Sequence, residues 1–218
     1  DSSAASDVYK RQGRLTEAEA SFNQAIALKP DFATAHNNLG NTLEELGRLT
    51  EAEASHKEAI AYKPDYAEAH NNLGIALRGL GRFNEQKASF EQAIALKPDY
   101  AEAHNNLGNT LHRLGGLTEA EASFKQAIAL KPDYAEAHNN LGGTLTGLGR
   151  LTEAEACFNQ AIALKPDFAE AYRQVTIIKK LDSQDERFLK MLKLHRDNVL
   201  SDDQLSLIHI SEPTRLAE

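Results

Sequence analysis

The five-residue string HNNLG occurs four times in this chain of 218 residues, at a constant step of 34 residues. The same step separates five prolines, Pro30, Pro64, Pro98, Pro132 and Pro166. Self-similarity at such a period indicates small structural repeats that stack on their neighbours rather than one globular core. The pattern delimits four complete repeats flanked by two half repeats, namely 33–66, 67–100, 101–134 and 135–168 between 13–32 and 169–181.

The spacing inside each repeat is helical. In the repeat 101–134, small and apolar residues recur at steps of three and four, first over 101–114 and again over 120–130. This is the stripe of an amphipathic helix, so each repeat is predicted to be an antiparallel helix pair. Capping-box spacing precedes both helices, at Asp99 with Glu102 and at Thr118 with Glu121. Proline follows the second helix at a position where a helix cannot continue.

This pattern resembles the tetratricopeptide repeat (TPR). The family's small, aromatic, Leu-Gly, Ala and Pro positions fall on Ala101, His104, Leu107, Gly108, Ala120, Phe124, Ala127 and Pro132. The resemblance implies an all-α fold, a right-handed α-solenoid of antiparallel helix pairs whose first helices line a concave groove. The chain departs from the family where Gln86 replaces an alanine and His56 replaces an aromatic residue.

Both ends of the chain break the pattern. Residues 2–12 (SSAASDVYKRQ) and 205–215 (LSLIHISEPTR) resemble in-frame translations of sequencing adapters. We therefore expect 1–12 and 205–218 to be non-native tails, and the chain to be a metagenomic fragment of a longer reading frame. Residues 182–204 contain a charged amphipathic stretch, predicted to be a C-terminal capping helix or linker.

The charge balance limits the classes of partner. The chain has 24 Lys and Arg against 32 Asp and Glu, which gives a net charge of −8. Nucleic acid and anionic membranes attract basic surfaces, so the sequence predicts neither as a partner. No apolar run is long enough to span a bilayer and no secretory signal is visible. This pattern favours a bacterial cytoplasmic location.

Motifs that would support catalysis are missing from the sequence. The chain has one cysteine, Cys157, and neither a nucleotide-binding glycine loop nor a zinc-protease motif. Packed helices lie roughly 10 Å apart, whereas metal ligands bond at about 2 Å, so the repeated histidines are predicted to pack between helices. These histidines are His36, His70, His104 and His138. We expect no catalytic residue, no metal and no cofactor, so the chain as given is predicted not to be an enzyme.

Eight asparagines on the first helices are the most informative polar residues, because asparagine is a poor former of helix interiors. They are Asn38, Asn72, Asn106 and Asn140, each directly before Leu-Gly, and Asn37, Asn71, Asn105 and Asn139. The first row is similar to the asparagine ladder of O-linked N-acetylglucosamine transferases, which implies a grip on a peptide backbone. The alternative is that these amides solvate the groove or bond neighbouring segments, and the sequence leaves both open.

Further groove positions vary from repeat to repeat. The predicted peptide-binding groove also includes Asn41, Asn109, Arg78 and His112. Some members of the family bind a C-terminal carboxylate through Lys or Arg in the groove. The corresponding positions hold Asn and Glu here, which argues against binding of a C-terminal carboxylate. Gly142, Gly143 and Gly147 predict that the helix containing them is the least stable, because glycine costs roughly 1 kcal/mol relative to alanine.

Three functions remain open at this level. The first is a non-catalytic scaffold that holds an extended peptide or a protein partner in the groove. The second is the recognition arm of a larger enzyme, because the stretch from residue 171 to residue 204 resembles the linker of bacterial TPR-sulfotransferase proteins. Alternatively, the larger enzyme is a glycosyltransferase similar to the O-linked N-acetylglucosamine transferases. The third is a structural spacer, with weak self-association through the truncated ends.

Overall fold

A computed structural model describes residues 2–179, with side chains from residue 13 to residue 178. These residues form ten α-helices, and no strand occurs among them. The helices are α1 (Ser2–Leu28), α2 (Ala33–Glu45), α3 (Leu49–Tyr62), α4 (Ala67–Gly79), α5 (Phe83–Leu96), α6 (Ala101–Arg113), α7 (Leu117–Leu130), α8 (Ala135–Gly147), α9 (Leu151–Leu164) and α10 (Ala169–Lys179). The all-α prediction is confirmed.

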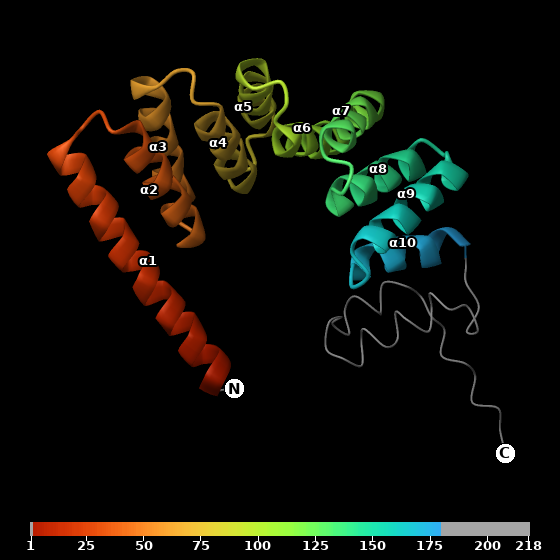
Figure 1. Ribbon diagram of the computed structural model, residues 1–218, viewed down its shortest axis with the longest axis horizontal. Helices are drawn as coiled ribbons and strands as arrows, with labels where there is room; N and C mark the ends of the chain where they lie inside the picture. Colours follow the sequence, from red (N-terminus) through yellow and green to blue (C-terminus); the bar gives the residue numbers. More distant parts are fainter. Residues whose placement is uncertain (1, 180–218) are drawn as a thin grey trace. The chain divides into compact units, whose positions relative to one another are not determined.

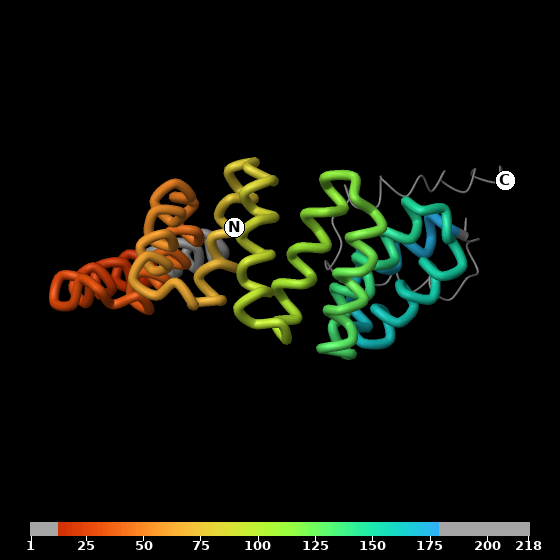
Figure 2. Tube along the Cα trace, turned by 90° about the horizontal axis from the view of Figure 1, so that it is seen from above, coloured from red at the N-terminus to blue at the C-terminus, as the bar shows by residue number. Residues whose placement is uncertain are grey.

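The described residues fall into two compact units that divide between Leu114 and Gly115. In the first unit, α2 packs against α3 and α4 packs against α5, and each pair packs against the next helix along the chain (Figure 1). In the second unit, α8 and α9 form a pair of the same kind. Figure 2 follows the Cα trace through these pairs, in which a short turn reverses the chain.

A left-handed glycine makes that turn. Gly47 has φ +76°, a conformation that side chains with a Cβ rarely adopt. The Gly47 N–H donates to the carbonyl of Glu44 at 2.9 Å, and the Arg48 N–H donates to the carbonyl of Leu43 at 2.9 Å. This is the Schellman arrangement, which satisfies the last carbonyls of α2 and redirects the chain into α3. The same positive φ recurs at Gly81, Gly115 and Gly149.

The predicted capping boxes are wrong. Helix α6 begins after Tyr100 and α7 begins after Gly116, and neither helix has a side-chain cap hydrogen bond. Asp99 lies one residue too early, because a preceding turn joins the Tyr100 N–H to the carbonyl of Lys97 at 3.1 Å. That turn, rather than an acidic cap, sets where the first helix of a repeat begins.

The core of each pair is an aromatic ring packed on a glycine. Phe90 and Phe158 are almost fully buried, and each ring lies against the glycine of the HNNLG string. A Cβ added to Gly74 would lie 2.5 Å from Cε1 of Phe90, so only glycine allows the two helices to approach this closely. His56 occupies the same slot beside Gly40.

The repeated histidines fix one pair to the next. The Nε2 atom of His70 lies 3.1 Å from the carbonyl oxygen of Pro64, and His104 makes the equivalent 2.9 Å bond to Pro98. These bonds reach the segment that joins one helix pair to the next, and the packing of all four histidines between helices stays a prediction. In α10, Tyr172 takes over this role, with its hydroxyl donating to the carbonyl of Pro166 at 3.3 Å.

Arginines at the helix-pair turns link consecutive pairs through carboxylates. Arg82 pairs with Glu53 of the preceding pair at 2.7 Å and with Glu85 of its own pair. Arg82 is open to solvent while Glu53 is buried. Ion pairs at the protein surface contribute about 0.2–1 kcal/mol each, so these pairs add modestly to the stability that packing provides. The equivalent bridges join Arg48 to Glu19 and Glu51, and Arg150 to Glu121 and Glu153.

Helix α1 begins at Ser2, so its backbone runs through the predicted repeat boundary at residue 13 without a break. The predicted capping helix within 182–204 and the adapter-like tail 205–218 lie outside the described residues. The non-native origin of both tails stays a prediction. Within residues 2–179, no helix combines the length and the hydropathy needed to cross a bilayer.

Candidate functional site

The HNNLG string places two kinds of asparagine on each first helix. The first asparagine is turned into the packing, and Asn37, Asn71 and Asn105 are each about 5% exposed or less. The second asparagine lies one residue further around the helix and is half-buried. The two predicted rows are therefore different: one is internal and one borders solvent.

Amide hydrogen bonds connect the two rows across repeats in the first unit. The Asn72 Nδ2 donates to Asn37 Oδ1 at 3.1 Å, and the Asn106 Nδ2 donates to Asn71 Oδ1 at 3.0 Å. Within one helix, Asn71 Nδ2 also donates to Asn72 Oδ1 at 3.3 Å. The asparagines thus form a ladder that joins α2, α4 and α6, which explains why residues of poor helix propensity recur here.

The ladder leaves amide groups available at the solvent side. Asn38 makes no side-chain hydrogen bond among the described residues, and Asn106 donates only to Asn71, so its own Oδ1 remains open. Asn140 occupies the corresponding position on α8 in the second unit, beside Asn139, whose Oδ1 is buried without a partner in the described part of the chain. Hydrogen bonds between the asparagines of neighbouring helices are therefore present. Binding of a peptide backbone by the second asparagine of each string stays a prediction.

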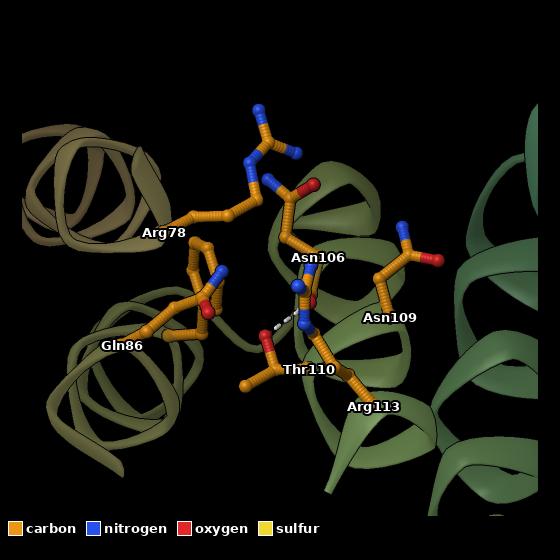
Figure 3. Close-up of a pocket in the computed structure, with 7 residues that line it drawn as sticks. Arg78, Gln86, Asn106, Asn109, Thr110 and Arg113 are labelled. Carbon is orange, nitrogen blue, oxygen red and sulfur yellow. Dashed lines mark hydrogen bonds between the residues drawn. The ribbon is translucent and has the colours of Figure 1, made fainter. Parts of the chain in front are cut away.

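A pocket of about 220 Å³ lies beside the ladder in the first unit, between α4, α5 and α6 (Figure 3). It is lined by Arg78, Gln86, Phe90, Asn106, Asn109, Thr110 and Arg113. In Figure 3, Arg78 and Asn106 are turned toward one another, and a dashed line joins Thr110 to Asn106. Thr110 Oγ1 donates to the backbone carbonyl of Asn106 at 2.9 Å. Three predicted groove residues, Arg78, Asn106 and Asn109, therefore meet in one place.

The other predicted groove residues do not line this pocket. Asn41 is half-buried on α2, and His112 is exposed on α6 next to a pocket residue. The sequence did not predict Arg113 as a groove residue, and it did not predict that Gln86 lines a pocket. A signal existed, because Phe83 stands where the other repeats carry leucine, and the Arg113 guanidinium lies 4.4 Å from the Phe83 ring centre.

A buried acid–histidine pair lies elsewhere in the first unit. The His56 side chain is fully buried, and its Nε2 lies 3.9 Å from Oε1 of Glu44, too far for a hydrogen bond. Burial raises the pKa of Glu44 to about 7, against a smaller opposing effect of the nearby Arg78 charge. Burial also lowers the pKa of His56 to about 4. Both groups are therefore neutral over a wide range of pH.

Cys157 lies half-buried on α9 without the surroundings of a nucleophile. Burial and then the Glu153 charge raise the pKa of its thiol. Because the thiolate is the reactive form, we expect Cys157 to react with Ellman's reagent at neutral pH several-fold more slowly than free cysteine. Stopped-flow absorbance measures this rate, and the urea-unfolded chain, which should react at the ordinary rate, is the control. A native rate above the unfolded rate would contradict the expectation.

The described residues contain no group of three or more His, Cys, Asp or Glu side chains suited to holding a metal ion. Comparison with known families then identifies the repeats. Profiles described as "TPR repeat" match residues 7–47, 40–81 and 76–115, and one described as "Tetratricopeptide repeat" matches 99–167. The chain belongs to the tetratricopeptide repeat family. The resemblance seen in the sequence is confirmed over the repeats themselves.

Solved TPR structures share this fold. The type IV pilus biogenesis factor PilW is 25% identical with a TM-score of 0.77, and the match covers 94% of this chain and 96% of that one. YrrB, described as a TPR protein with an unusual peptide-binding site, is 25% identical with a TM-score of 0.64, covering 85% and 95%. A thermophilic TPR protein of Thermus thermophilus, TTC0263, is 28% identical with a TM-score of 0.62, covering 80% and 95%.

No curated protein sequence shows significant similarity to this chain. The fold is the all-α helical solenoid of TPR proteins, and the likeness to TPR proteins supports a role as a scaffold for protein interaction.

Proposed function

We propose that this TPR array binds an extended peptide along the first helices, with the second row of asparagines holding the peptide backbone. The supporting observation is the state of the amides at the solvent side of the ladder. Asn38 and Asn106 keep hydrogen-bonding groups unused by the described residues, and both residues are half-buried. An amide supplies both donors and an acceptor, as a peptide backbone requires.

The ladder gives this arrangement its rigidity. Asn106 is fixed by its bond to Asn71, so it loses little side-chain freedom when a peptide arrives. Backbone contacts of this kind do not depend on peptide sequence, because each peptide residue presents the same N–H and C=O groups. We therefore expect moderate affinity for many extended peptides.

The test requires a variant that removes a groove amide without disturbing the ladder. Asn38→Ala meets this condition, since its side chain bonds to nothing among the described residues, whereas Asn72→Ala would also leave the buried Asn37 Oδ1 without that donor. We expect Asn38→Ala to weaken peptide binding about 5–10-fold with little change in melting temperature. Asn72→Ala is expected to lower both affinity and melting temperature.

Fluorescence polarisation with a library of labelled, unstructured peptides measures this binding. Asn84→Ala is the matched control, because Asn84 is exposed on α5, a second helix, and should leave affinity unchanged. A library in which no peptide binds, or in which Asn38→Ala and Asn84→Ala behave alike, would reject backbone recognition by the asparagines.

The two other functions foreseen from the sequence remain predictions. The stretch 182–204, which carries much of the resemblance to a transferase linker, lies outside the described residues. Sequencing the gene on both sides of this segment tests whether a sulfotransferase or glycosyltransferase domain follows. Light scattering over a range of concentrations tests the self-associating spacer, which requires a mass that rises with concentration.

A further inference from the structure

The pocket between α4, α5 and α6 contains two arginines that form no close ion pair among the described residues, although the Arg78 charge lies near enough to Glu44 to lower the pKa of that carboxyl. Neither Arg78 nor Arg113 has a carboxylate within 4 Å in the part of the chain that the structure describes. The arginines at the helix-pair turns differ, because Arg48, Arg82 and Arg150 each contact two glutamates. Two guanidinium groups therefore line one pocket of a chain whose net charge is −8.

The chain also holds one of these groups in position. The Arg113 guanidinium lies 4.4 Å from the centre of the Phe83 ring, a cation–π contact that limits its rotation. Gln86, which is 4% exposed, adds a polar wall where the other repeats carry alanine. Phe83 and Gln86, which replace the leucine and the alanine of the other repeats, therefore both act on this pocket, Gln86 as a lining residue and Phe83 through its contact with Arg113.

The neighbouring amides extend the set of donors. Asn106 and Asn109 line the pocket with the two arginines, and Figure 3 shows Arg78 and Asn106 turned toward one another. A guanidinium donates two parallel hydrogen bonds to a carboxylate, and such charge-assisted pairs are about twice as strong as neutral ones. An amide beside them can donate to the same oxygens.

We propose that this pocket binds the side-chain carboxylate of an Asp or Glu residue within the extended peptide. The proposal rests on the proposed function, because the asparagine row carries the peptide past the pocket. The asparagines would bind the backbone of any extended peptide. The pocket would select peptides that have an acidic residue at one position. A ligand of higher negative charge is disfavoured by the overall charge of −8.

The experiment compares peptides that differ at one position. The probes are labelled peptides with acetylated and amidated ends, selected for binding and then varied to Glu, Gln, phosphoserine or Lys at each position in turn. At one position, we expect Glu to bind about 10-fold more tightly than Gln, with a ratio that falls as salt is raised. Blocked ends ensure that a terminal carboxylate does not supply the effect.

Variants then assign the preference to the pocket. Arg78→Gln combined with Arg113→Gln should reduce the Glu-to-Gln ratio to about 2 or less, because the preference for the carboxylate depends on the two guanidinium groups. Both residues are exposed, so the fold should persist, and circular dichroism and melting temperature verify it. Arg48→Gln is the control, since it removes one equal charge from a guanidinium that already holds two glutamates.

Each outcome bears on the proposal. Equal binding of Glu and Gln peptides at every position overturns it and leaves backbone recognition intact, whereas no peptide binding at all overturns both. Phosphoserine binding far more tightly than Glu overturns the assignment to an acidic side chain. An Arg48→Gln effect equal to that of one pocket arginine would show that long-range charge, rather than the pocket, produces the preference.

Discussion

Alanine in place of Gly142 is expected to destabilise the second unit, whereas alanine in place of the adjacent Gly143 is expected to stabilise it. A Cβ at Gly142 would lie 2.6 Å from Cε1 of the fully buried Phe158 ring, so the two helices would have to separate. A Cβ at Gly143 would meet nothing within 4 Å. The two sites share one helix, α8, and differ only in what faces them.

The magnitudes follow from two opposing effects. Replacing glycine by alanine in a helix contributes about 1 kcal/mol at either site. Overpacking at Gly142 costs about 1–3 kcal/mol against this gain. The free energies of unfolding of the two variants should therefore differ by about 1–3 kcal/mol, with Gly143→Ala above the parent chain by about 1 kcal/mol.

Hydrogen exchange resolved to Ala135–Gly147 measures the local free energy, and urea unfolding gives the overall value. If this helix opens first, as its three glycines predict, Gly143→Ala should slow its exchange about 5-fold. Equal effects of the two substitutions would show that the aromatic slot yields to an added methyl group, contrary to the packing described above.

The helix pairs were predictable because the repeat fixes their period. The helical stripes and the proline step place α6 and α7 close to where the structure has them. The helix starts were not predictable from capping-box spacing, since Tyr100 and Gly116 occupy the cap positions and a backbone turn replaces a side-chain cap. A local pattern could not reveal that turn.

The candidate site was predictable in its residue types and less so in its contacts. The sequence singled out Asn72 and Asn106, but their bonds reach residues 35 positions earlier, in the preceding repeat. Pairing across repeats depends on how one helix pair is rotated against the next, which the sequence pattern does not give. Arg113 was missed for the same reason, because its partner Phe83 lies on another helix.

Glu44→Gln and His56→Phe are both expected to raise the free energy of unfolding, the first at high pH and the second at low pH. Burial raises the pKa of Glu44 from its ordinary 4.5 to about 7, so the folded chain keeps a proton that the unfolded chain releases between these values. Stability contributed by this group therefore falls as pH rises from 4.5 to 7. The total loss is about 3 kcal/mol, an upper limit because the carboxyl is partly exposed.

His56 has the opposite dependence. Burial lowers its pKa from 6.5 to about 4, so the unfolded chain takes up a proton that the folded chain does not hold in this window. Stability falls as pH drops from 6.5 to 4, again by about 3 kcal/mol at most. In the parent chain the two slopes oppose each other between pH 4.5 and 6.5, so the pair contributes little net dependence on pH there.

The difference in the free energy of unfolding between each variant and the parent chain should show the pH dependence of the group that was removed. Relative to the parent chain, Glu44→Gln should gain nothing below pH 4.5 and about 3 kcal/mol above pH 7. His56→Phe, which places in this slot the residue found in the other repeats, should gain about 3 kcal/mol below pH 4 and progressively less up to pH 6.5. Urea unfolding of parent and variant at matched pH gives these differences, in which the titration of all other carboxylates cancels.

Differences that stay constant from about pH 4 to about pH 8 would mean that neither group is held neutral by burial. A loss of stability in Glu44→Gln that grows as pH rises to 4.5 and persists above it would instead mean that Glu44 is ionised and paired with a charged His56. The 3.9 Å separation and the unpartnered Oε1 and Nε2 atoms argue against that pairing, because an ion pair buried to this extent requires close contact and further hydrogen bonds to offset desolvation. The sign of the pH dependence therefore distinguishes two neutral groups from a buried ion pair.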